Sequence, residues 1–259
     1  MVTSTRNSFD LTGSLAVVVG ASQGIGAAIA EAFAGSGARL VIASRAASRL
    51  EDTRARCLEA GGEVYVGTVD VRSPASVTDL AAEVAERHGT PTILVNSAGA
   101  GARGPALELT VAEWDETQEV QLRGPFLACQ AFARLMSDGG YGKIINLSST
   151  WAATVGAERS AYCAAKAGLS HLTAALATEW APLGIRVNAL APTATRTPSR
   201  EAQWSAQPGA EDALRSRIPL GRLAEPHDLV GGALFLASRA SDFVTGHTLF
   251  VDGGWHHAK

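Results

Sequence analysis

The chain has few charged residues, few cysteines and no long apolar run, and each absence narrows its class. Only 18% of its 259 residues are charged, and 22 Lys and Arg are outnumbered by 25 Asp and Glu, which argues against nucleic-acid binding. Its longest apolar runs, about five residues, are far shorter than the roughly 20 residues that span a bilayer. Met1 to Gly13 is polar where a signal peptide needs an apolar stretch. We therefore expect a soluble, cytoplasmic protein that binds neither membrane nor nucleic acid.

Cysteine and histidine offer no metal or disulfide pattern. The cysteines are odd in number and form no CxxC pair: Cys57, Cys129 and Cys163. Cys163 stands beside a tyrosine of interest, but its small, helical flanks favour helix packing over a role as nucleophile. His256 and His257 are adjacent and lack a third ligand, which favours a solvated C-terminal tail over a metal site. We predict no metal centre.

Short β-branched runs alternate with alanine-rich helical stretches. The spacing predicts strands at Leu15–Val19, Leu40–Ala43, Val64–Val69, Ile93–Val95, Ile144–Leu147, Arg186–Leu190 and Thr248–Val251. It predicts helices at Ile25–Ala34, Ser48–Ala60, Ser76–Arg87, Ala112–Met136, Ala161–Trp180 and Pro226–Ala237. Strands that are apolar throughout are buried on both faces, and alternation with helices implies right-handed crossovers. The fold class is therefore α/β, a Rossmann-type doubly wound sheet of seven parallel strands with helices on both faces, in one domain over residues 1–259.

One segment does not fit this alternation. Thr193–Ile218 contains Pro198, Pro208 and Trp204 and shows no clean periodicity. A stretch of this length inside a compact domain is usually a lid or a binding loop, although a passive surface excursion is the alternative. We expect a substrate lid at about residues 193–218.

A glycine-rich turn follows the first strand and opens the first helix, with the sequence Gly20-Ala21-Ser22-Gln23-Gly24-Ile25-Gly26. Glycines here permit a tight turn and a close approach of backbone to a pyrophosphate, which then lies on the N–H groups at the positive end of the helix. A purely structural turn is the alternative. The position at a strand–helix junction favours dinucleotide binding.

A tyrosine and a lysine lie one helical turn apart on the same face of a predicted helix, at Tyr162 and Lys166. Free tyrosine titrates near pH ~10, and a neighbouring ammonium lowers its pKa toward the working pH that acid–base chemistry needs. Taken alone, the pair is more typical of a solvated surface. Ser149 changes this, because it follows the strand Ile144–Leu147 and so reaches the sheet edge where doubly wound folds bind ligands. Its hydroxyl can hydrogen-bond a carbonyl oxygen that the tyrosine protonates.

These motifs together resemble the short-chain dehydrogenase/reductase family, in its branch of roughly 250 residues, from about Asp10 to Gly254. The glycine turn resembles the family's Thr-Gly-x-x-x-Gly-x-Gly, and Asn96-Ser97-Ala98-Gly99 resembles its Asn-Asn-Ala-Gly. Ser149, Tyr162 and Lys166 match its catalytic Ser and Tyr-x-x-x-Lys. The run Pro192 to Thr197 resembles Pro-Gly-x-x-x-Thr, and Asp252-Gly253-Gly254 resembles its usual ending. Five motifs in order at family spacing make the resemblance specific.

The resemblance implies NAD(P)-dependent oxidation of an alcohol or reduction of a carbonyl. Tyr162 would be the general acid or base, Lys166 would hydrogen-bond the nicotinamide ribose and lower the pKa of Tyr162, and Ser149 would orient the carbonyl oxygen. Asp70 and Val71 match positions that flank the adenine. The full set of implied cofactor-binding residues is Gly20, Ser22, Gln23, Gly24, Ile25, Gly26, Ser44, Arg45, Asp70, Val71, Asn96, Ala98, Gly99, Tyr162, Lys166, Pro192 and Thr197.

The chain departs from the family pattern at four positions. Val19 replaces the threonine that braces the first turn, so we expect packing to substitute for it. Ser97 replaces an asparagine, and Thr193 replaces the glycine after the lid's proline, which would stiffen the base of the lid. Gln121 stands where many members have the asparagine that completes a proton relay behind the lysine. Glutamine keeps the amide but adds a methylene, so we place Gln121 in the catalytic set as its weakest member.

The end of the second strand favours NADP(H) over NAD(H). An NAD enzyme of this kind usually has an Asp there that accepts hydrogen bonds from the ribose 2′-OH, whereas this chain has Ser44 and Arg45. A guanidinium binds a 2′-phosphate that a carboxylate would repel. Gln23 is neutral where some NADP-preferring members carry a second basic residue. The alternatives are an Arg45 that only faces solvent, and NAD(H) as cofactor.

The substrate is a small carbonyl or alcohol that the sequence does not identify further. Trp151 and Trp204 suit an apolar or aromatic ring or fill ordinary core space. An anionic substrate would be bound by arginines, and the candidates are Arg103, Arg159 and Arg196. The alternative is that these side chains only face solvent.

Within the family, a sugar or alcohol dehydrogenase and a reductase of 3-oxoacyl groups on acyl carrier protein remain alternatives. The loop Asp138-Gly139-Gly140-Tyr141 and Leu183 offer no cation for an acidic carrier, which weighs against the second. A dinucleotide sensor without turnover is a third alternative, which an intact Ser–Tyr–Lys set disfavours. The long alanine-rich helices permit close packing between subunits, and the resemblance to family members that are commonly tetramers implies a homotetramer.

Overall fold

The structure is a computed structural model that describes residues 9–99, 101–205 and 209–258. In these residues the strands form one parallel sheet of seven, in the order β3-β2-β1-β4-β5-β6-β7. The strands are β1 Leu15–Val19, β2 Arg39–Ser44, β3 Val64–Thr68, β4 Ile93–Asn96, β5 Gly142–Leu147, β6 Ile185–Pro192 and β7 Thr248–Val251. The predicted doubly wound sheet of seven parallel strands is confirmed.

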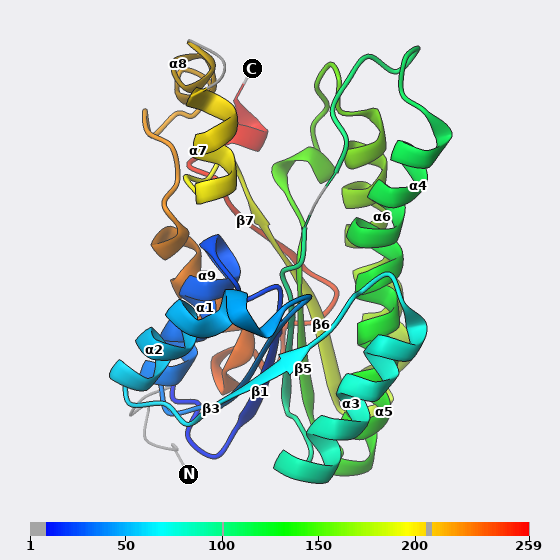
Figure 1. Cartoon of the computed structure of the whole chain (residues 1–259), viewed down its shortest axis with the longest axis vertical. Helices are drawn as coiled ribbons and strands as arrows, with labels where there is room; N and C mark the ends of the chain where they lie inside the picture. Colours follow the sequence, from blue (N-terminus) through cyan, green and yellow to red (C-terminus); the bar gives the residue numbers. More distant parts are fainter. Residues whose placement is uncertain (1–8, 100, 206–208, 259) are drawn as a thin grey trace.

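Helices cover both faces of the sheet. They are α1 Gly24–Gly35, α2 Glu51–Glu59, α3 Pro74–His88, α4 Val111–Gln118, α5 Gly124–Gly139, α6 Ser160–Trp180, α7 Pro198–Ser205, α8 Ala210–Arg215 and α9 Val230–Ala237. Figure 1 shows α1, α2 and α9 on one side and α3, α4, α5 and α6 on the other. Phe33 lies in the apolar layer of the first side and Phe132 in that of the second, both fully buried. Strand β1 is fully buried and its side chains meet both layers, which is why its sequence is apolar throughout.

The sheet has its switch point between β1 and β4. From β1 the chain builds β2 and β3 to one side, and it then returns to place β4 and the later strands on the other. Val19 at the end of β1 is level with Ala43 of β2 and with Asn96 of β4. The connections that leave β1 and β4 therefore diverge at the carboxyl edge, which opens the crevice where such folds bind ligands.

The single long helix predicted at Ala112–Met136 is wrong in one respect. The structure has α4, then a π-helical segment at Glu119–Arg123, then α5. Pro125 has no N–H and cannot donate the i→i−4 hydrogen bond to the carbonyl of Gln121. The preceding residue, Gly124, donates its N–H to the carbonyl of Glu119, five residues back rather than four, and this widens the turn.

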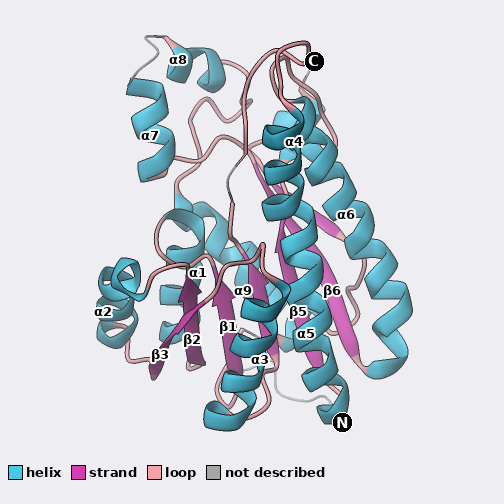
Figure 2. Ribbon diagram, turned by 45° about the vertical axis from the view of Figure 1, so that its right-hand side comes forward, coloured by secondary structure: helices cyan, strands magenta, loops and turns pink. Residues whose placement is uncertain are grey.

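The starts of two predicted helices and the content of the predicted lid segment also differ from the expectation. The predicted helices Ser48–Ala60 and Pro226–Ala237 begin with 3₁₀ turns at Ala47–Leu50 and Pro226–Leu229, a frequent form of a helix start. Segment 193–218 contains α7 and α8, which lie beyond the carboxyl ends of the strands in Figure 2. No helix in the described ranges is both long and apolar enough to cross a membrane.

Candidate active site

A cleft of about 420 Å³ lies at the carboxyl edge of the sheet, along the ends of β1, β4, β5 and β6. It is lined by nearly every residue that the sequence nominated. These are Gly20, Ser22, Gln23, Gly24, Ile25, Gly26, Ser44, Arg45, Asp70, Val71, Ala98, Gly99, Gln121, Ser149, Tyr162, Lys166, Pro192 and Thr197. Among the residues nominated for catalysis or cofactor binding, Asn96 is the exception. Residues from eight separate parts of the chain thus meet in one cavity, which is what a dinucleotide and a small substrate would need.

The glycine turn packs more closely against its neighbours than any side chain would allow. Gly20 has a φ of 88°, and a Cβ there would lie 2.3 Å from the amide nitrogen of Ala98. A Cβ on Gly26 would lie 2.3 Å from the carbonyl oxygen of Gly20. Gln23, the N-cap residue of α1, makes no side-chain capping bond in the described structure, so its side chain does not close the helix terminus. These features fit a dinucleotide pyrophosphate on the first N–H groups of α1.

A hydroxyl from another helix braces this turn where Val19 cannot. The Thr53 Oγ1 of α2 is fully buried and donates to the carbonyl oxygen of Ala21 at 2.9 Å. The Gly20 N–H donates to the Ala43 carbonyl at 2.8 Å. The expectation that packing alone replaces the family threonine is therefore incomplete. No sequence signal pointed to Thr53, because a threonine inside a predicted helix has no local marker for a partner so distant along the chain.

Tyr162 and Ser149 form the centre of the site. Tyr162 lies in the first turn of α6, and Ser149 lies just beyond β5. Burial raises the pKa of Tyr162, while the positive charge of Arg200, a hydrogen bond with Ser149 and the charge of Arg159 oppose this rise. Ser149 Oγ accepts a hydrogen bond from the Trp151 N–H at 3.2 Å. Because its oxygen accepts from Trp151, the Ser149 hydroxyl keeps its proton for donation, and its partner in this structure is the Tyr162 hydroxyl oxygen.

Lys166 is held by the end of β5 rather than by the tyrosine hydroxyl. Its Nζ donates to the Leu147 carbonyl oxygen at 2.5 Å and lies 5.7 Å from the centroid of the Tyr162 ring. Burial lowers the pKa of Lys166 to about 7. The charges that lower the pKa of Tyr162 in this structure are those of arginines, so the predicted effect of Lys166 on Tyr162 stays a prediction.

The helix that carries these residues is joined to β5 by buried polar side chains. The Asn146 Nδ2 donates to Thr173 Oγ1 of α6 at 3.0 Å, and the hydroxyls of Ser148 and Ser170 are 2.7 Å apart. Asn96 extends this network, because its Nδ2 donates to Asn146 Oδ1 at 2.9 Å. The Asn96 side chain therefore points into the network and does not line the cleft. Its contribution is to hold β4, β5 and α6 in register beneath the site.

Gln121 lies in the π-helical segment, buried, with its amide beside the loop after β4. A Cβ on Gly99 would be 3.5 Å from Gln121 Nε2. The side chain is only 3% exposed and lines the cleft. A π-helical segment at a functional site is a recurrent feature of enzymes, and here it turns Gln121 toward the cavity. Its part in a proton relay stays a prediction.

Two arginines lie at the end of β2, one of which the sequence had not nominated. Arg45 and Arg49 both line the cleft, and their spacing of four residues was the available signal. The Ser44 hydroxyl donates to the Ala46 carbonyl oxygen at 2.8 Å, so it shapes the turn that presents Arg45. The positive charge of Arg45 contributes to lowering the pKa of Asp70. This end of the cavity is thus rich in cations.

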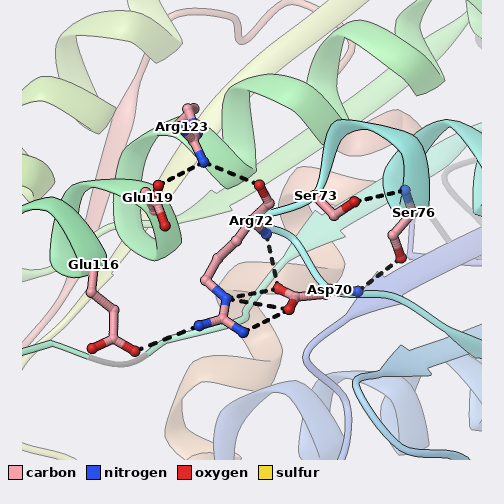
Figure 3. A network of polar contacts seen from close by, with 7 residues as sticks. All are labelled: Asp70, Arg72, Ser73, Ser76, Glu116, Glu119 and Arg123. Carbon is pink, nitrogen blue, oxygen red and sulfur yellow. Dashed lines mark hydrogen bonds and ion pairs between the residues drawn. The ribbon is translucent and has the colours of Figure 1, made fainter.

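Asp70 is held by an ion-pair network that Figure 3 shows. The guanidinium of Arg72 makes bidentate contacts with the Asp70 carboxylate, at 2.7 Å and 3.0 Å, and lowers the pKa of Asp70 to about 2. Arg72 also reaches Glu116 of α4 at 3.7 Å, and Arg123 donates to the Arg72 carbonyl oxygen at 3.1 Å. The network ties the loop after β3 to α4 and the π-helical segment.

The opposite end of the cleft has an apolar wall and a second group of arginines. Trp151, Trp204, Trp255 and Leu214 line it, and the rings of Trp151 and Trp255 meet edge to face with centroids 5.8 Å apart. The arginines that line it here are Arg103, Arg159 and Arg200. Arg196, nominated from sequence, does not line the cleft. It is ion-paired to Glu211 at 2.6 Å and to Glu225 at 3.2 Å.

The cysteine and histidine expectations are settled in part. Burial raises the pKa of Cys57 to about 11 and that of Cys129 to about 12, as expected of core thiols. The solvated tail expected at His256 is wrong. Its Nδ1 lies 2.5 Å from Asp252 Oδ2 and its ring stacks on Phe250, because a 3₁₀ turn with buried Trp255 docks the tail. No group of three potential metal ligands occurs in the described residues.

Comparison with known proteins agrees with this geometry. A family model described as enoyl-(acyl carrier protein) reductase matches residues 20–256. The chain is 40% identical over 250 residues to D-threitol dehydrogenase of Mycolicibacterium smegmatis, covering 95% of this chain and 94% of that protein. The chain belongs to the short-chain dehydrogenase/reductase family.

Two further relatives of this short-chain dehydrogenase/reductase are informative. Galactitol 2-dehydrogenase (L-tagatose-forming) of Cereibacter sphaeroides is 42% identical over 253 residues, covering 96% of this chain and 98% of that one. A gluconate 5-dehydrogenase of Burkholderia cenocepacia, solved with NADP and tartrate, superposes with a TM-score of 0.93 at 36% identity, covering 98% of this chain and 99% of the other. The protein is an NAD(P)-dependent oxidoreductase that acts on CH–OH or C=O groups.

Proposed function

We propose that this protein interconverts a secondary alcohol and a ketone on a small polyhydroxy molecule, with NADP(H) as its preferred cofactor and NAD(H) as the alternative. The observation that carries the proposal is the meeting of Ser149, Tyr162 and Lys166 with the glycine turn in one cleft. The names of the threitol, galactitol and gluconate dehydrogenases support a sugar-derived substrate. A ketoreductase direction and an alcohol dehydrogenase direction use the same groups.

Tyr162 holds the proton that the reaction moves. When bound, the nicotinamide supplies or accepts the hydride. Tyr162 Oη gives its proton to the substrate oxygen in reduction and removes it in oxidation. Arg200 and Arg159 oppose the rise in the pKa of Tyr162 that burial causes, which brings the phenol closer to a useful range. Ser149 donates its hydroxyl proton to the same substrate oxygen and so orients the reacting carbon.

Lys166 and the base of the lid would hold the nicotinamide half. The hydrogen bond between Lys166 and the Leu147 carbonyl fixes the amino group of Lys166 at the cleft, where it would meet the ribose. Pro192 and Thr197 line the cleft, and a Cβ on Gly24 would lie 2.9 Å from Thr197 Cγ2, so the lid's base rests on the glycine turn. We propose that segment 193–218, in one domain with the rest of the chain, closes over the substrate.

The adenine half would lie between the glycine turn and the loop after β3. Asp70 and Val71 line the cavity there, and Arg45 and Arg49 stand where a 2′-phosphate would be bound. Guanidinium groups form charge-assisted, often bidentate hydrogen bonds to phosphate, and nearby carboxylates would oppose it. Arg72 already neutralises Asp70, so that carboxylate does not cancel the attraction. This charge arrangement supports the preference for NADP(H).

Binding and turnover test the proposal separately. Titrating the protein with NADPH and NADH should give at least tenfold tighter binding of NADPH, and Arg45→Asp should remove that preference while NADH affinity changes less than threefold. Tyr162→Phe should abolish oxidation of a polyol panel and leave NADPH affinity unchanged, because only the proton-carrying hydroxyl is lost. Equal affinity for both cofactors would refute the NADP(H) assignment. Activity of Tyr162→Phe above a few per cent would refute the acid–base role.

We also propose a homotetramer in the cytoplasm. Leu122, Phe126 and Leu172 line an apolar hollow between the π-helical segment, α5 and α6, and this supports association through these helices. Light scattering at micromolar concentration should give four times the chain mass of 26.7 kDa. A monomeric mass would refute the assembly without affecting the catalytic proposal.

A further inference from the structure

The substrate end of the cleft concentrates positive charge around Tyr162. Arg103, Arg159 and Arg200, hereafter the arginine cluster, line the cavity together with the tyrosine. Arg200 and Arg159 both act on the pKa of Tyr162, and burial, Arg200 and Arg103 lower the pKa of Arg159. These mutual effects place the three guanidinium groups near one another. Glu158 contacts Arg103 at 3.2 Å, and no ion pair among the described residues involves Arg159.

Arg159 occupies a position that folding alone disfavours. It is the N-cap residue of α6, partly buried at the positive end of that helix, and its side chain makes no capping bond. A cation there is opposed by the helix dipole and by the neighbouring arginines. Within the described residues it has no carboxylate at ion-pair distance. The acidic side chains that line the cleft, Asp70 and Glu116, are ion-paired to Arg72.

The segment that presents Arg159 is also strained. Glu158 has a φ of 60° and is the one non-glycine residue with a left-handed backbone among those the structure describes. Such a conformation costs on the order of 1 kcal/mol and clusters at functional sites. The Glu158 carbonyl accepts a hydrogen bond from the Gly104 N–H at 3.3 Å, which ties the strained residue to the loop that carries Arg103. This bond joins the loop of Arg103 to the residue before Arg159, and both arginines line the cleft.

We infer that the arginine cluster binds an anionic group, a carboxylate or a phosphate ester, of the polyhydroxy substrate whose reacting carbon lies at Tyr162. The inference rests on the proposed function and narrows its substrate class to acids or phosphates of sugars. The phosphates of the cofactor are matched by α1 and by Arg45 and Arg49, and so they do not account for the cluster. A neutral polyol would bring no counter-charge to Arg159, whereas an anion forms charge-assisted hydrogen bonds with it.

Three six-carbon substrates test the inference by turnover: D-glucitol, D-gluconate and D-glucitol 6-phosphate, each with NADP+. The wild type should have a kcat/KM for one of the anions at least tenfold above that for D-glucitol. Because Arg159 also acts on the pKa of Tyr162, Arg159→Gln should slow all three substrates, and its loss of kcat/KM should be at least tenfold larger for the anion than for D-glucitol. Arg87→Gln, which removes the same charge from a residue ion-paired to Glu83 at the end of α3, should leave all three values unchanged. The comparison of D-gluconate with D-glucitol 6-phosphate shows whether the arginine cluster prefers a carboxylate or a phosphate ester.

A loss of equal size for all three substrates, together with a raised kinetic pKa, would show that Arg159 acts only through Tyr162 and would overturn the inference. A wild type that prefers D-glucitol would also overturn it.

A measurement of anion binding tests the inference independently of the proposed function. D-Gluconate and D-glucitol 6-phosphate are titrated calorimetrically into the NADPH-saturated protein, wild type and Arg159→Gln, at low and at 0.3 M salt, where charges are more strongly screened. If one anion binds Arg159→Gln at least tenfold more weakly than the wild type, the inference is supported, even where no substrate turns over. Absence of turnover would refute only the proposed function. Turnover of D-glucitol without binding of either anion would refute the inference and leave the proposed function standing.

Discussion

Two glycine-to-alanine substitutions in helices of this protein should have opposite effects on stability. Gly26 lies in the first turn of α1, where an added Cβ would be 2.3 Å from the Gly20 carbonyl oxygen and 2.9 Å from Ser97 Oγ. Gly231 lies in α9, is exposed, and has no atom within 4 Å of an added Cβ. The two changes add the same methyl group to a helix. They differ only in what that methyl meets.

The expected magnitudes follow from these distances. A carbon and a carbonyl oxygen in close contact are about 3.3 Å apart, so Gly26→Ala must displace α1 from the turn by about 1 Å. Overpacking of this kind costs about 1–3 kcal/mol. Gly231→Ala should instead stabilise by about 0.5–1 kcal/mol, since alanine loses less backbone entropy in a helix. The free energies of unfolding should therefore differ by about 2–4 kcal/mol between the variants.

Urea denaturation of both variants, followed by circular dichroism, measures this difference, and NADPH titration tests its functional part. Gly26→Ala should weaken NADPH binding at least tenfold, about 1.4 kcal/mol, because the shifted α1 terminus no longer approaches the pyrophosphate. Gly231→Ala should bind NADPH as the wild type does. The reasoning about the turn fails if Gly26→Ala matches the wild type in both stability and NADPH affinity.

Three more predictions concern buried and charged groups. Burial lowers the pKa of Lys166 from 10.5 to about 7, so the unfolded chain binds more protons between these values, and stability should rise with pH there by up to about 1.4 kcal/mol per unit. Lys166→Met should lose this slope in urea melts from pH 7.5 to 9.5, and an unchanged slope would refute the burial of a neutral amine. Asn146→Ala removes the oxygen that accepts from Asn96 and the amide that donates to Thr173, and it should cost about 2–4 kcal/mol in the same assay, with less than 1 kcal/mol contradicting the network. Arg72→Met removes the bidentate partner of Asp70, so NMR titration should find the Asp70 pKa raised from about 2 toward the ordinary ~3.9; a value still near 2 would assign the shift to another group.

Local pattern was enough to predict the sheet and most of the residues that meet at its carboxyl edge. Apolar runs of strand length, separated by helical stretches, predicted all seven strands, because burial on both faces imposes its own composition. The glycine turn could also be predicted from local sequence. A Cβ on Gly20 or Gly26 would lie 2.3 Å from a backbone atom, so only glycine fits at these two positions. The one-turn spacing of Tyr162 and Lys166 placed both on one helical face before the fold was known.

Tertiary structure decided what depends on chain segments far apart in the sequence. Thr53 braces Ala21, and Asn96 turns to Asn146, through contacts that form only after long loops close. The arginines were alike in the sequence, yet folding directed Arg159 into the cleft and bound Arg196 to glutamates outside it. Hydrophobic periodicity specifies which face of an element is buried, whereas the partner of a polar side chain depends on packing geometry that no local window contains. For this reason the sequence predicted the reaction class, whereas only the folded chain showed which of the arginines line the cleft.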